Sequence, residues 1–264
     1  MMDLTEYRSN SLEQQRTADL LSLVPQGLES VLDVGARDGH FSKLLTSRCE
    51  RVTALDLQRP TFDIERVTCV AGDACALEFG DDHFDLVFCA EVLEHIPPES
   101  LAKACAELSR VSGRYLLIGV PDRQDIRHGR TTCGACGTSN PPWGHVNSFD
   151  EPRLHALFSD CVVARRSLVG STKERTNALS AALMNWAGNP YGTYSQEETC
   201  GHCSAPVLAP ASRSWLQKVA TRVAFKVDDA RRPFLSARGN WIHLLLEKKH
   251  IRAASGQTAS ARTP

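Results

Sequence analysis

The feature that most constrains the fold is a short apolar run that leads into a glycine turn and then into a helix. Residues 31–34 read Val-Leu-Asp-Val, and Gly35 and Gly39 follow them. Glycine adopts positive φ angles that a side chain disfavours, so two glycines four positions apart indicate a tight turn. Apolar side chains then recur at helical spacing through residues 41–45. This order predicts a strand, a turn and a helix that leave bare backbone open to a ligand.

The glycine spacing distinguishes between two kinds of nucleotide site. A dinucleotide fingerprint has three glycines, as G-x-G-x-x-G, whereas this turn has two, with Asp33 two positions before the first. The pattern resembles motif I of the class I S-adenosylmethionine (SAM)-dependent methyltransferases. The resemblance implies that Asp33 lies near the methionine end of SAM and that Gly35 to Gly39 pass beneath it. Arg37 stands where the family commonly has a middle glycine, and Asp38 stands where a small residue is frequent. NAD is the alternative cofactor.

Three further segments follow in the order of the same family's motifs. Residues 51–57 form an expected strand that ends at Asp56, about twenty residues after the turn, where a carboxylate can accept ribose hydroxyls. The third segment is Gly-Asp-Ala at 72–74, and the resemblance implies that Asp73 bonds the adenine amino group, with Ala74 beside it. Residues 84–97 resemble the fourth motif, in which Glu91 is a candidate for the SAM amino group. Taken singly, each aspartate could be an ordinary strand-end cap; the four motifs in order favour SAM.

Strands and helices alternate along the chain, which predicts an α/β fold. A chain of 264 residues that is 42% hydrophobic and 23% charged can bury one full core. We expect a Rossmann-like, doubly wound, seven-stranded sheet with insertions after strands 5 and 6. The expected parts are an N-terminal helical segment (1–28), a SAM-binding core (29–170) with a zinc-knuckle loop (122–148), a helical insertion with a second C-x-x-C pair (171–239), a final strand (240–250) and a disordered tail (251–264).

The later elements can be placed approximately from periodicity and helix-start signals. Expected strands lie at 114–120, 161–169 and 241–248, with the last pairing beside the sixth. Expected helices lie at 149–158, 173–187 and 211–227. A further helix at 4–23, with Leu12, Leu20 and Leu21 on its apolar side, would close over SAM or pack on a partner.

Two of the cysteine pairs have metal-ligand spacing. Cys133 and Cys136 form one C-x-x-C pair and Cys200 and Cys203 the other, each with glycine nearby. Four thiolates give a closed tetrahedral Zn²⁺ site, although more than sixty residues separate these pairs and a zinc ribbon separates its pairs by about 15–20. A redox C-x-x-C is the alternative, and His128, His145 and His202 are possible substitute ligands. Four other cysteines are expected to be buried thiols (Cys69, Cys89, Cys105 and Cys161).

The loop after the fifth expected strand narrows the resemblance. Its Cys-x-x-Cys-Gly, followed by Trp-Gly-His at 143–145 and Ser-Phe at 148–149, resembles a subset of bacterial methyltransferases of the type 11 group, some of which act in glycan or natural-product pathways. His145 and Asn147 would then line the pocket that faces SAM. His95 and His145 are the candidate general bases for a hydroxyl acceptor, with Glu91 a third. The alternatives are that His95 caps a turn and that His145 binds zinc.

Charge is unevenly distributed along the chain, whose formal net charge is −1. The part after Ala205 is strongly basic (Arg213, Lys218, Arg222, Lys226, Arg231, Arg232, Arg238, Lys248 and Lys249). It is either a solvated face or a contact for RNA, an anionic lipid surface or a phosphorylated glycan precursor. No apolar run is long enough to span a bilayer and the N-terminus lacks signal-peptide features, which predicts a cytoplasmic protein.

Three functions are consistent with the sequence. The first is O-methylation of a small molecule or a glycan or natural-product intermediate, with a zinc-braced substrate lid. The second is an RNA or protein methyltransferase that docks its substrate through the zinc module and the basic segment. The third is a non-catalytic SAM or zinc binding module. The first is preferred, because Glu-Val-Leu-Glu-His at 91–95 stands where nucleic-acid amino-methylating enzymes often carry Asn/Asp-Pro-Pro-Tyr/Phe.

Overall fold

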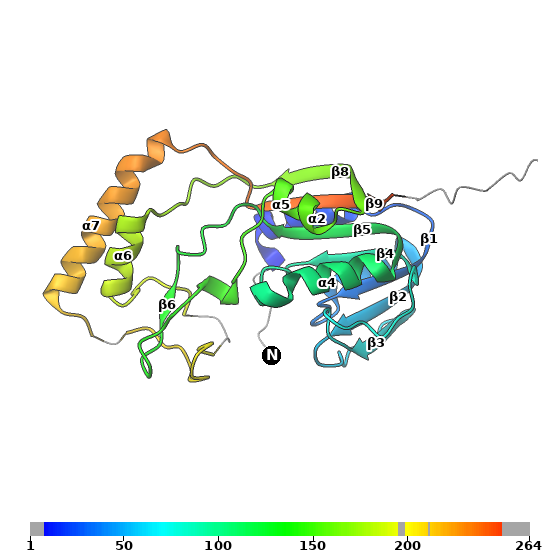
Figure 1. Cartoon of the computed structure of the whole chain (residues 1–264), viewed down its shortest axis with the longest axis horizontal. Helices are drawn as coiled ribbons and strands as arrows, with labels where there is room; N and C mark the ends of the chain where they lie inside the picture. The colour runs from blue at the N-terminus through cyan, green and yellow to red at the C-terminus, as the bar shows by residue number, and fades with distance from the viewer. Residues whose placement is uncertain (1–7, 195–198, 211, 250–264) are drawn as a thin grey trace, which may run out of the picture.

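The computed structural model describes residues 8–194, 199–210 and 212–249, which build a seven-stranded sheet flanked by helices (Figure 1). The strand order is β3-β2-β1-β4-β5-β9-β8. The strands are β1 (Leu28–Val34), β2 (Cys49–Asp56), β3 (Val67–Ala71), β4 (Phe84–Ala90), β5 (Ser112–Pro121), β8 (Cys161–Val169) and β9 (Trp241–Lys248). The first five are parallel, and β9 runs antiparallel between β5 and β8. The prediction of seven strands in a doubly wound sheet is confirmed.

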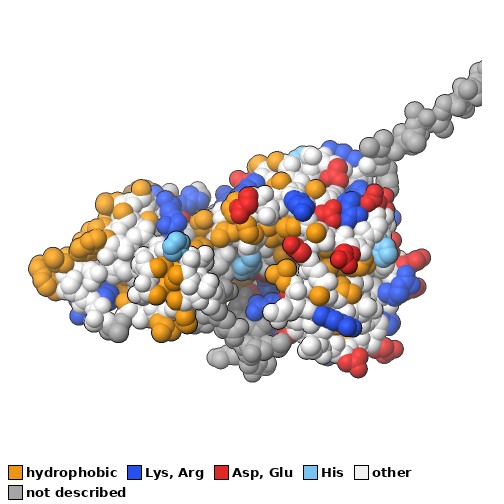
Figure 2. All heavy atoms as spheres, turned by 60° about the horizontal axis from the view of Figure 1, so that its bottom comes forward, with side chains coloured by type: hydrophobic (Ala, Val, Ile, Leu, Met, Phe, Trp, Pro, Cys, Tyr) orange, Lys and Arg blue, Asp and Glu red, His pale blue; other side chains and the backbone are white. Residues whose placement is uncertain are grey.

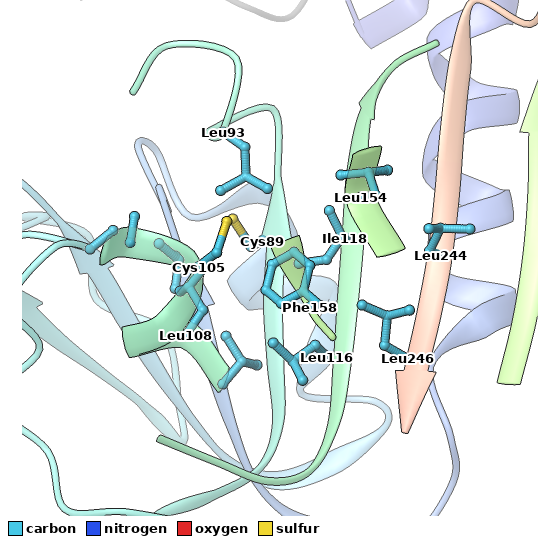
Figure 3. Packing of buried hydrophobic residues seen from close by; sticks show 14 of the residues in the cluster. Cys89, Leu93, Cys105, Leu108, Leu116, Ile118, Leu154, Phe158, Leu244 and Leu246 are labelled. Carbon is cyan, nitrogen blue, oxygen red and sulfur yellow. The ribbon is translucent and has the colours of Figure 1, made fainter. Parts of the chain in front are cut away.

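Helices cover both faces of this sheet. On one face, α4 (Pro98–Val111) and α5 (Glu151–Leu157) pack on a core in which Cys89, Cys105 and Phe158 are completely buried (Figure 3). On the other face, α2 (Ser11–Leu23) and α3 (His40–Leu45) bury a second apolar cluster. Cys69 is only half-buried in the edge strand β3, so its expected full burial is wrong.

The helix α2 packs on the C-terminal half of the sheet, against β5, β8 and β9. Its buried side chains are Leu20 and Leu23 together with Glu13 and Arg16, so the expected apolar side at Leu12, Leu20 and Leu21 is correct only at Leu20. Asp19 Oδ2 lies 2.6 Å from His243 Nδ1 in β9. The helix therefore belongs to the fold of this chain and brings two charged residues toward the strand ends.

Two long segments separate the later strands, after β5 and after β8. Residues 122–148 hold β6 (Thr131–Thr132), β7 (Ser139–Asn140) and the 3-10 turn η1 (Pro142–Gly144). The segment between β8 and β9 holds α6 (Ala178–Trp186), α7 (Trp215–Arg231) and η2 (Arg232–Phe234), and its two helices lie side by side away from the sheet (Figure 1).

Capping residues set the starts of these two helices. The side chain of Asn177 accepts hydrogen bonds at the start of α6, and that of Ser214 does so at the start of α7. The predicted ranges 173–187 and 211–227 were therefore too early, because the caps fix the first turn more strongly than the apolar spacing does. The expected tail (251–264) lies outside the described residues. Among the described residues, no helix is both long enough and apolar enough to cross a bilayer.

Candidate cofactor, acceptor and metal sites

The glycine turn after β1 has the conformation that its sequence predicts. Gly35 and Gly39 have φ angles of +76° and +80°, and Arg37 between them also has a positive φ, of 46°. A Cβ at Gly35 would collide with Val92, and a Cβ at Gly39 would lie 2.7 Å from the ring of Phe62. Both positions therefore require glycine for conformation and for space.

Asp33 lies at the end of β1 and is 2% exposed. Its Oδ2 accepts a hydrogen bond of 2.5 Å from Ser42 Oγ at the start of α3. Burial raises the pKa of Asp33 to about 7; the Ser42 hydrogen bond opposes this rise and the Asp56 carboxylate adds to it. A cation placed beside Asp33 would favour its ionised form.

Asp56 and Asp73 follow β2 and β3 at the same edge of the sheet. The Asp56 carboxylate accepts from Arg37 N at 2.9 Å and from Leu57 N at 2.8 Å, one hydrogen bond to each oxygen. These bonds fix its orientation and leave each oxygen further acceptor capacity. Asp73 Oδ1 accepts from Cys75 N at 2.8 Å. The structure thus brings Asp33, Asp56 and Asp73 to the C-terminal ends of three adjacent parallel strands, where ligands bind in such sheets.

Glu91, which follows β4, lies beside the buried side chain of Arg16, a residue that is not among the candidates from the sequence analysis. Arg16 Nη1 is 3.2 Å from Glu91 Oε2, and Arg16 Nη2 is 2.8 Å from Glu13 Oε2. The Arg16 guanidinium also lies 5.3 Å from the centre of a Trp241 ring. Burial raises the pKa of Glu91 and Arg16 opposes that rise. The i,i+3 spacing of Glu13 and Arg16 was the available signal, but such pairs are usually exposed.

The two candidate bases are neighbours. The rings of His95 and His145 are 4.6 Å apart between centres, and His145 is 8% exposed. Nδ1 of His145 lies 2.6 Å from Gln124 Oε1, so a proton on Nδ1 leaves the lone pair on Nε2. Burial, with a smaller contribution from His95, lowers the pKa of His145 to about 3. His145 is therefore a neutral imidazole near pH 7.

A buried carboxyl group adjoins these two rings. One potential ligand atom from each of Glu94, His95 and His145 lies within 4.8 Å of the other two, a set that could also hold a divalent cation. Burial and the Glu91 carboxylate raise the pKa of Glu94 well above its ordinary value. Asn147 does not line a pocket as expected, because it is 3% exposed and its Nδ2 donates to two carbonyl oxygens in the loop after β4.

A cavity of about 300 Å³, here called the inner cavity, lies beside this group. It is bounded by α2, the loop after β4 and both insertions. Its lining includes Glu13, Glu91, Gln124, Trp143, His145 and Trp241. His145 lines it and His95 does not, so His145 is the better placed of the two histidines for an acceptor.

Four cysteines from the two insertions meet in one group. The Sγ atoms of Cys133 and Cys203 are 3.6 Å apart, and those of Cys136 and Cys200 are 3.7 Å apart. A tetrahedral zinc ion with Zn–S bonds of about 2.3 Å needs sulfur separations of about 3.8 Å, whereas a disulfide needs about 2.05 Å. The donor set and spacing therefore fit a four-thiolate zinc site. Among the described residues, no histidine joins this group (His128, His145 and His202 were the candidates).

The two C-x-x-C segments have the same backbone pattern. In each, the N–H four residues after the first cysteine donates to that cysteine's carbonyl, at 2.9 Å in one segment and 2.8 Å in the other. Asn140 Oδ1 accepts from Gly201 N at 3.1 Å, which joins the two segments directly. Backbone N–H groups of His202 and Cys203 lower the pKa of Cys200 to about 6. The pKa of Cys203 is instead raised to about 12 by the neighbouring cysteines. The backbone contacts therefore hold the two loops in place, and the thiolate form is favoured at Cys200.

The basic segment forms most of α7, and its apolar side chains are exposed. Lys218, Arg222 and Lys226 lie on α7 beside exposed Trp215 and Val219. Hydrophobic side chains gather along the outer end of the helical insertion (Figure 2). The face of α7 that packs on α6 consists mainly of small residues. The segment is therefore an amphipathic helix with its apolar stripe in solvent.

Comparison with protein families matches residues 32–116 to the model of a methyltransferase domain. The match runs from β1 into β5 and includes the strand-end carboxylates described above. Among curated proteins, the ubiquinone biosynthesis O-methyltransferase of Aromatoleum aromaticum is 35% identical over 95 residues, which cover 32% of this chain and 41% of that protein. The chain thus spans about two fifths of the length of the curated relatives that it matches.

Solved structures share the fold at low identity. The N-methyltransferase NodS from Bradyrhizobium japonicum, in complex with S-adenosylhomocysteine, matches with a TM-score of 0.52 at 21% identity, over 64% of this chain and 85% of NodS. The 1,6-didemethyltoxoflavin-N1-methyltransferase of Burkholderia thailandensis matches with a TM-score of 0.52 at 16% identity, over 93% of this chain and 81% of that one. Residues 32–116 therefore match the model of a methyltransferase domain, and the chain has the fold of these solved structures.

Proposed function

We propose that this chain is a SAM-dependent methyltransferase that O-methylates a small molecule or a glycan or natural-product intermediate. The observation that carries the proposal is the row of Asp33, Asp56 and Asp73 at adjacent strand ends within the matched domain. Glu91, which follows the neighbouring strand β4, lines the inner cavity. A methyl donor and an acceptor can then meet in one crevice.

The residues at the strand ends fit SAM by their chemistry. The Asp56 carboxylate is oriented by two backbone N–H groups and can accept the ribose hydroxyls. Glu91 Oε1 is buried and makes no hydrogen bond within the described residues, so it can accept an ammonium group. Asp33 supplies a further carboxyl at the methionine end, and Asp73 and Ala74 lie at the adenine end. When bound, SAM supplies the electrophilic methyl group.

Residues around the inner cavity would orient the acceptor, exclude water and remove its proton. Nε2 of His145 takes the proton from the acceptor hydroxyl, while Gln124 holds the ring and its tautomer through Nδ1. Trp143 and Trp241 line the same cavity and exclude water from it. His95, which packs edge-on against His145, keeps that ring in place. The curated relatives are named as O-methyltransferases, which supports oxygen as the methylated atom.

Methyl transfer from labelled SAM into a fractionated cell extract tests the acceptor class. Label in the small-molecule or glycan fraction is the expected result. Label in RNA or protein would instead support the alternative, a methyltransferase that acts on a polymer. SAM binding without label in any fraction would favour a non-catalytic module. Nuclease treatment of the extract serves as the control, because a small-molecule acceptor survives it.

We propose as well that the four cysteines bind one structural Zn²⁺. The sulfur spacing supports this, and so does the paired backbone pattern of the two loops. The ion would join the insertion after β5 to the insertion after β8, both of which contribute to the inner cavity. Its role would be to hold the substrate lid together, since a closed site has no open position for chemistry.

A further inference from the structure

A second cavity, of about 320 Å³ and here called the outer cavity, lies between the loop after β5 and the helical insertion. Its lining contains five Lys and Arg side chains (Arg127, Arg130, Lys173, Arg175 and Arg232) and three acidic ones (Glu174, Asp228 and Asp229). No residue assigned to SAM, to zinc or to proton transfer belongs to it. The outer cavity is therefore a separate and mainly cationic space.

Some of these charges already have partners. Arg127 bonds both oxygens of Asp125, at 2.8 and 3.1 Å, and this contact helps to lower the pKa of Asp125 to about 2 against the effect of its burial. Asp228 accepts a hydrogen bond of 2.7 Å from Ser180 Oγ. Glu174 Oε2 lies 4.0 Å from His128 Nε2. These contacts account for one of the five cations and for two of the three carboxylates.

The other four cations make no ion pair within 4.0 Å among the described residues. They are Arg130, Lys173, Arg175 and Arg232. They share the outer cavity with Asp229, which makes no ion pair among the described residues either, and with Asp228, whose carboxylate accepts a hydrogen bond from the neutral Ser180 hydroxyl. Three guanidinium groups and one ammonium in a concave space form a site for a multiply charged oxyanion, because each guanidinium can bind two oxygens at once. A phosphate ester or diphosphate balances this charge better than a single carboxylate.

The outer and inner cavities are neighbours with a common wall. His128 and Glu174 line both of them. The inner cavity differs in character, since it presents Trp143, Trp241 and His145 together with several carboxylates. One molecule that spans both would place an uncharged, hydroxyl-bearing part at His145 and its anionic part in the outer cavity.

We propose that the outer cavity binds a phosphate or diphosphate group of the methyl acceptor. The inference rests on the proposed methyl transfer. It restricts the proposed acceptors from small molecules and glycans in general to phosphorylated ones. The cation cluster holds the anionic end of the acceptor and thereby sets which hydroxyl reaches His145. The affinity comes from charge, so it falls as salt screens the site.

Binding of inorganic pyrophosphate to the full chain, measured by titration calorimetry at low salt, tests the site without any methyl transfer. The double variant Lys173→Gln/Arg175→Gln removes two exposed cations of the cavity and should weaken binding on the order of tenfold. Asp229→Asn removes the uncompensated carboxylate and should strengthen it, a change that loss of folding cannot mimic. The matched control Arg51→Gln/Lys103→Gln makes the same charge change at two exposed positions outside the cavity and should leave affinity within about threefold.

Two results would overturn the proposal. One is the absence of measurable pyrophosphate binding; the other is an equal loss of affinity in the cavity variant and in the control, which would indicate a general charge effect. SAM binding measured on the same samples keeps this test distinct from that of the proposed activity. A chain that binds pyrophosphate in the outer cavity but methylates nothing would retain the anion site and lose the methyltransferase assignment.

Discussion

Carboxylates of the same kind acquire different properties at the ends of neighbouring strands. Asp33 is buried against a serine hydroxyl, and its pKa rises to about 7. Asp56, one strand away, receives two backbone N–H groups and is oriented by them. Local surroundings therefore decide which carboxylate suits ribose and which responds to a nearby cation.

Asp56→Asn should weaken SAM binding by about tenfold to a hundredfold. The amide keeps the size of the side chain but replaces one acceptor oxygen with a donor and removes the charge. Titration calorimetry with SAM measures the change. Glu65→Gln, an exposed carboxylate-to-amide change between β2 and β3, is the matched control. Equal SAM affinity in the Asp56 variant and the parent would remove Asp56 from the site.

Asp33 should make the cofactor-free protein less stable as pH rises. Its folded pKa of about 7 lies above the ordinary 3.8, so the folded chain binds the proton more tightly than the unfolded chain. Its contribution to the free energy of unfolding is therefore full below pH 4 and is lost toward pH 7, by at most roughly 1.4 kcal/mol per pH unit. Urea unfolding at pH 5, 6 and 7 should show a flatter dependence for Asp33→Asn. Parallel curves for the two proteins would contradict this.

His145→Asn should lower turnover by about 10² to 10⁴ with little change in SAM affinity. The reason is that His145 lines the inner cavity as a neutral imidazole whose Nδ1 faces Gln124. Initial rates on a true acceptor measure the effect. His83→Asn, an exposed histidine at the opposite end of β4, is the control. A His145 variant that turns over at the parental rate would exclude it as the base.

At the scale of elements, the sequence patterns predicted individual strands and helices better than they predicted contacts between distant segments. Apolar runs that end in Asp or Glu identified β1, β2 and β4, because buried parallel strands have an unambiguous composition. The expected pairing of β9 with β8 is also found. Arg16 and Gln124 could not be chosen in advance, since their roles depend on segments that are distant in the sequence. The meeting of the two C-x-x-C pairs was inferred from ligand chemistry alone, without any spacing signal.

The two insertions should depend on zinc. Elemental analysis of the purified chain should find about one zinc ion per chain, and Cys200→Ser/Cys203→Ser should lose most of it. The reason is that two of four ligands are removed from a site that joins two otherwise separate loops. Limited proteolysis should then cut the insertions faster while SAM binding persists. Cys75→Ser, a half-buried thiol outside the group, should keep the metal, and parental zinc content in the double variant would exclude the site.

At the scale of the whole molecule, the strand-end carboxylates belong to the sheet, and the two helices of the insertion after β8 lie away from it (Figure 1). Residues of both insertions line both cavities. The matched methyltransferase domain ends within β5, so neither insertion is part of it. The cationic side chains of the outer cavity, the two tryptophans of the inner cavity and the four-cysteine group thus all lie outside the residues that match the methyltransferase model. We propose that the choice of acceptor depends on that part.

The exposed stripe of α7 should bind an anionic surface. We propose this because Lys218 and Arg222 lie beside exposed Trp215 and Val219, a pattern typical of helices that lie in a lipid interface. Flotation with vesicles that contain phosphatidylglycerol should recover the chain at low salt, and Lys218→Gln/Arg222→Gln should reduce recovery several-fold. Equal recovery with neutral vesicles would contradict the electrostatic part of the proposal.

The most direct test of the central proposal is the acceptor-dependent formation of S-adenosylhomocysteine from SAM by the purified chain. Small-molecule and glycan fractions of an extract supply the acceptor, and Asp56→Asn supplies the matched negative protein. We predict product formation that requires a phosphorylated fraction and matches the gain of one methyl group in an acceptor detected by mass spectrometry. At SAM concentrations below saturation, the variant should form about tenfold to a hundredfold less product. SAM binding with no acceptor-dependent product from any fraction would contradict the assignment of this chain as a methyltransferase.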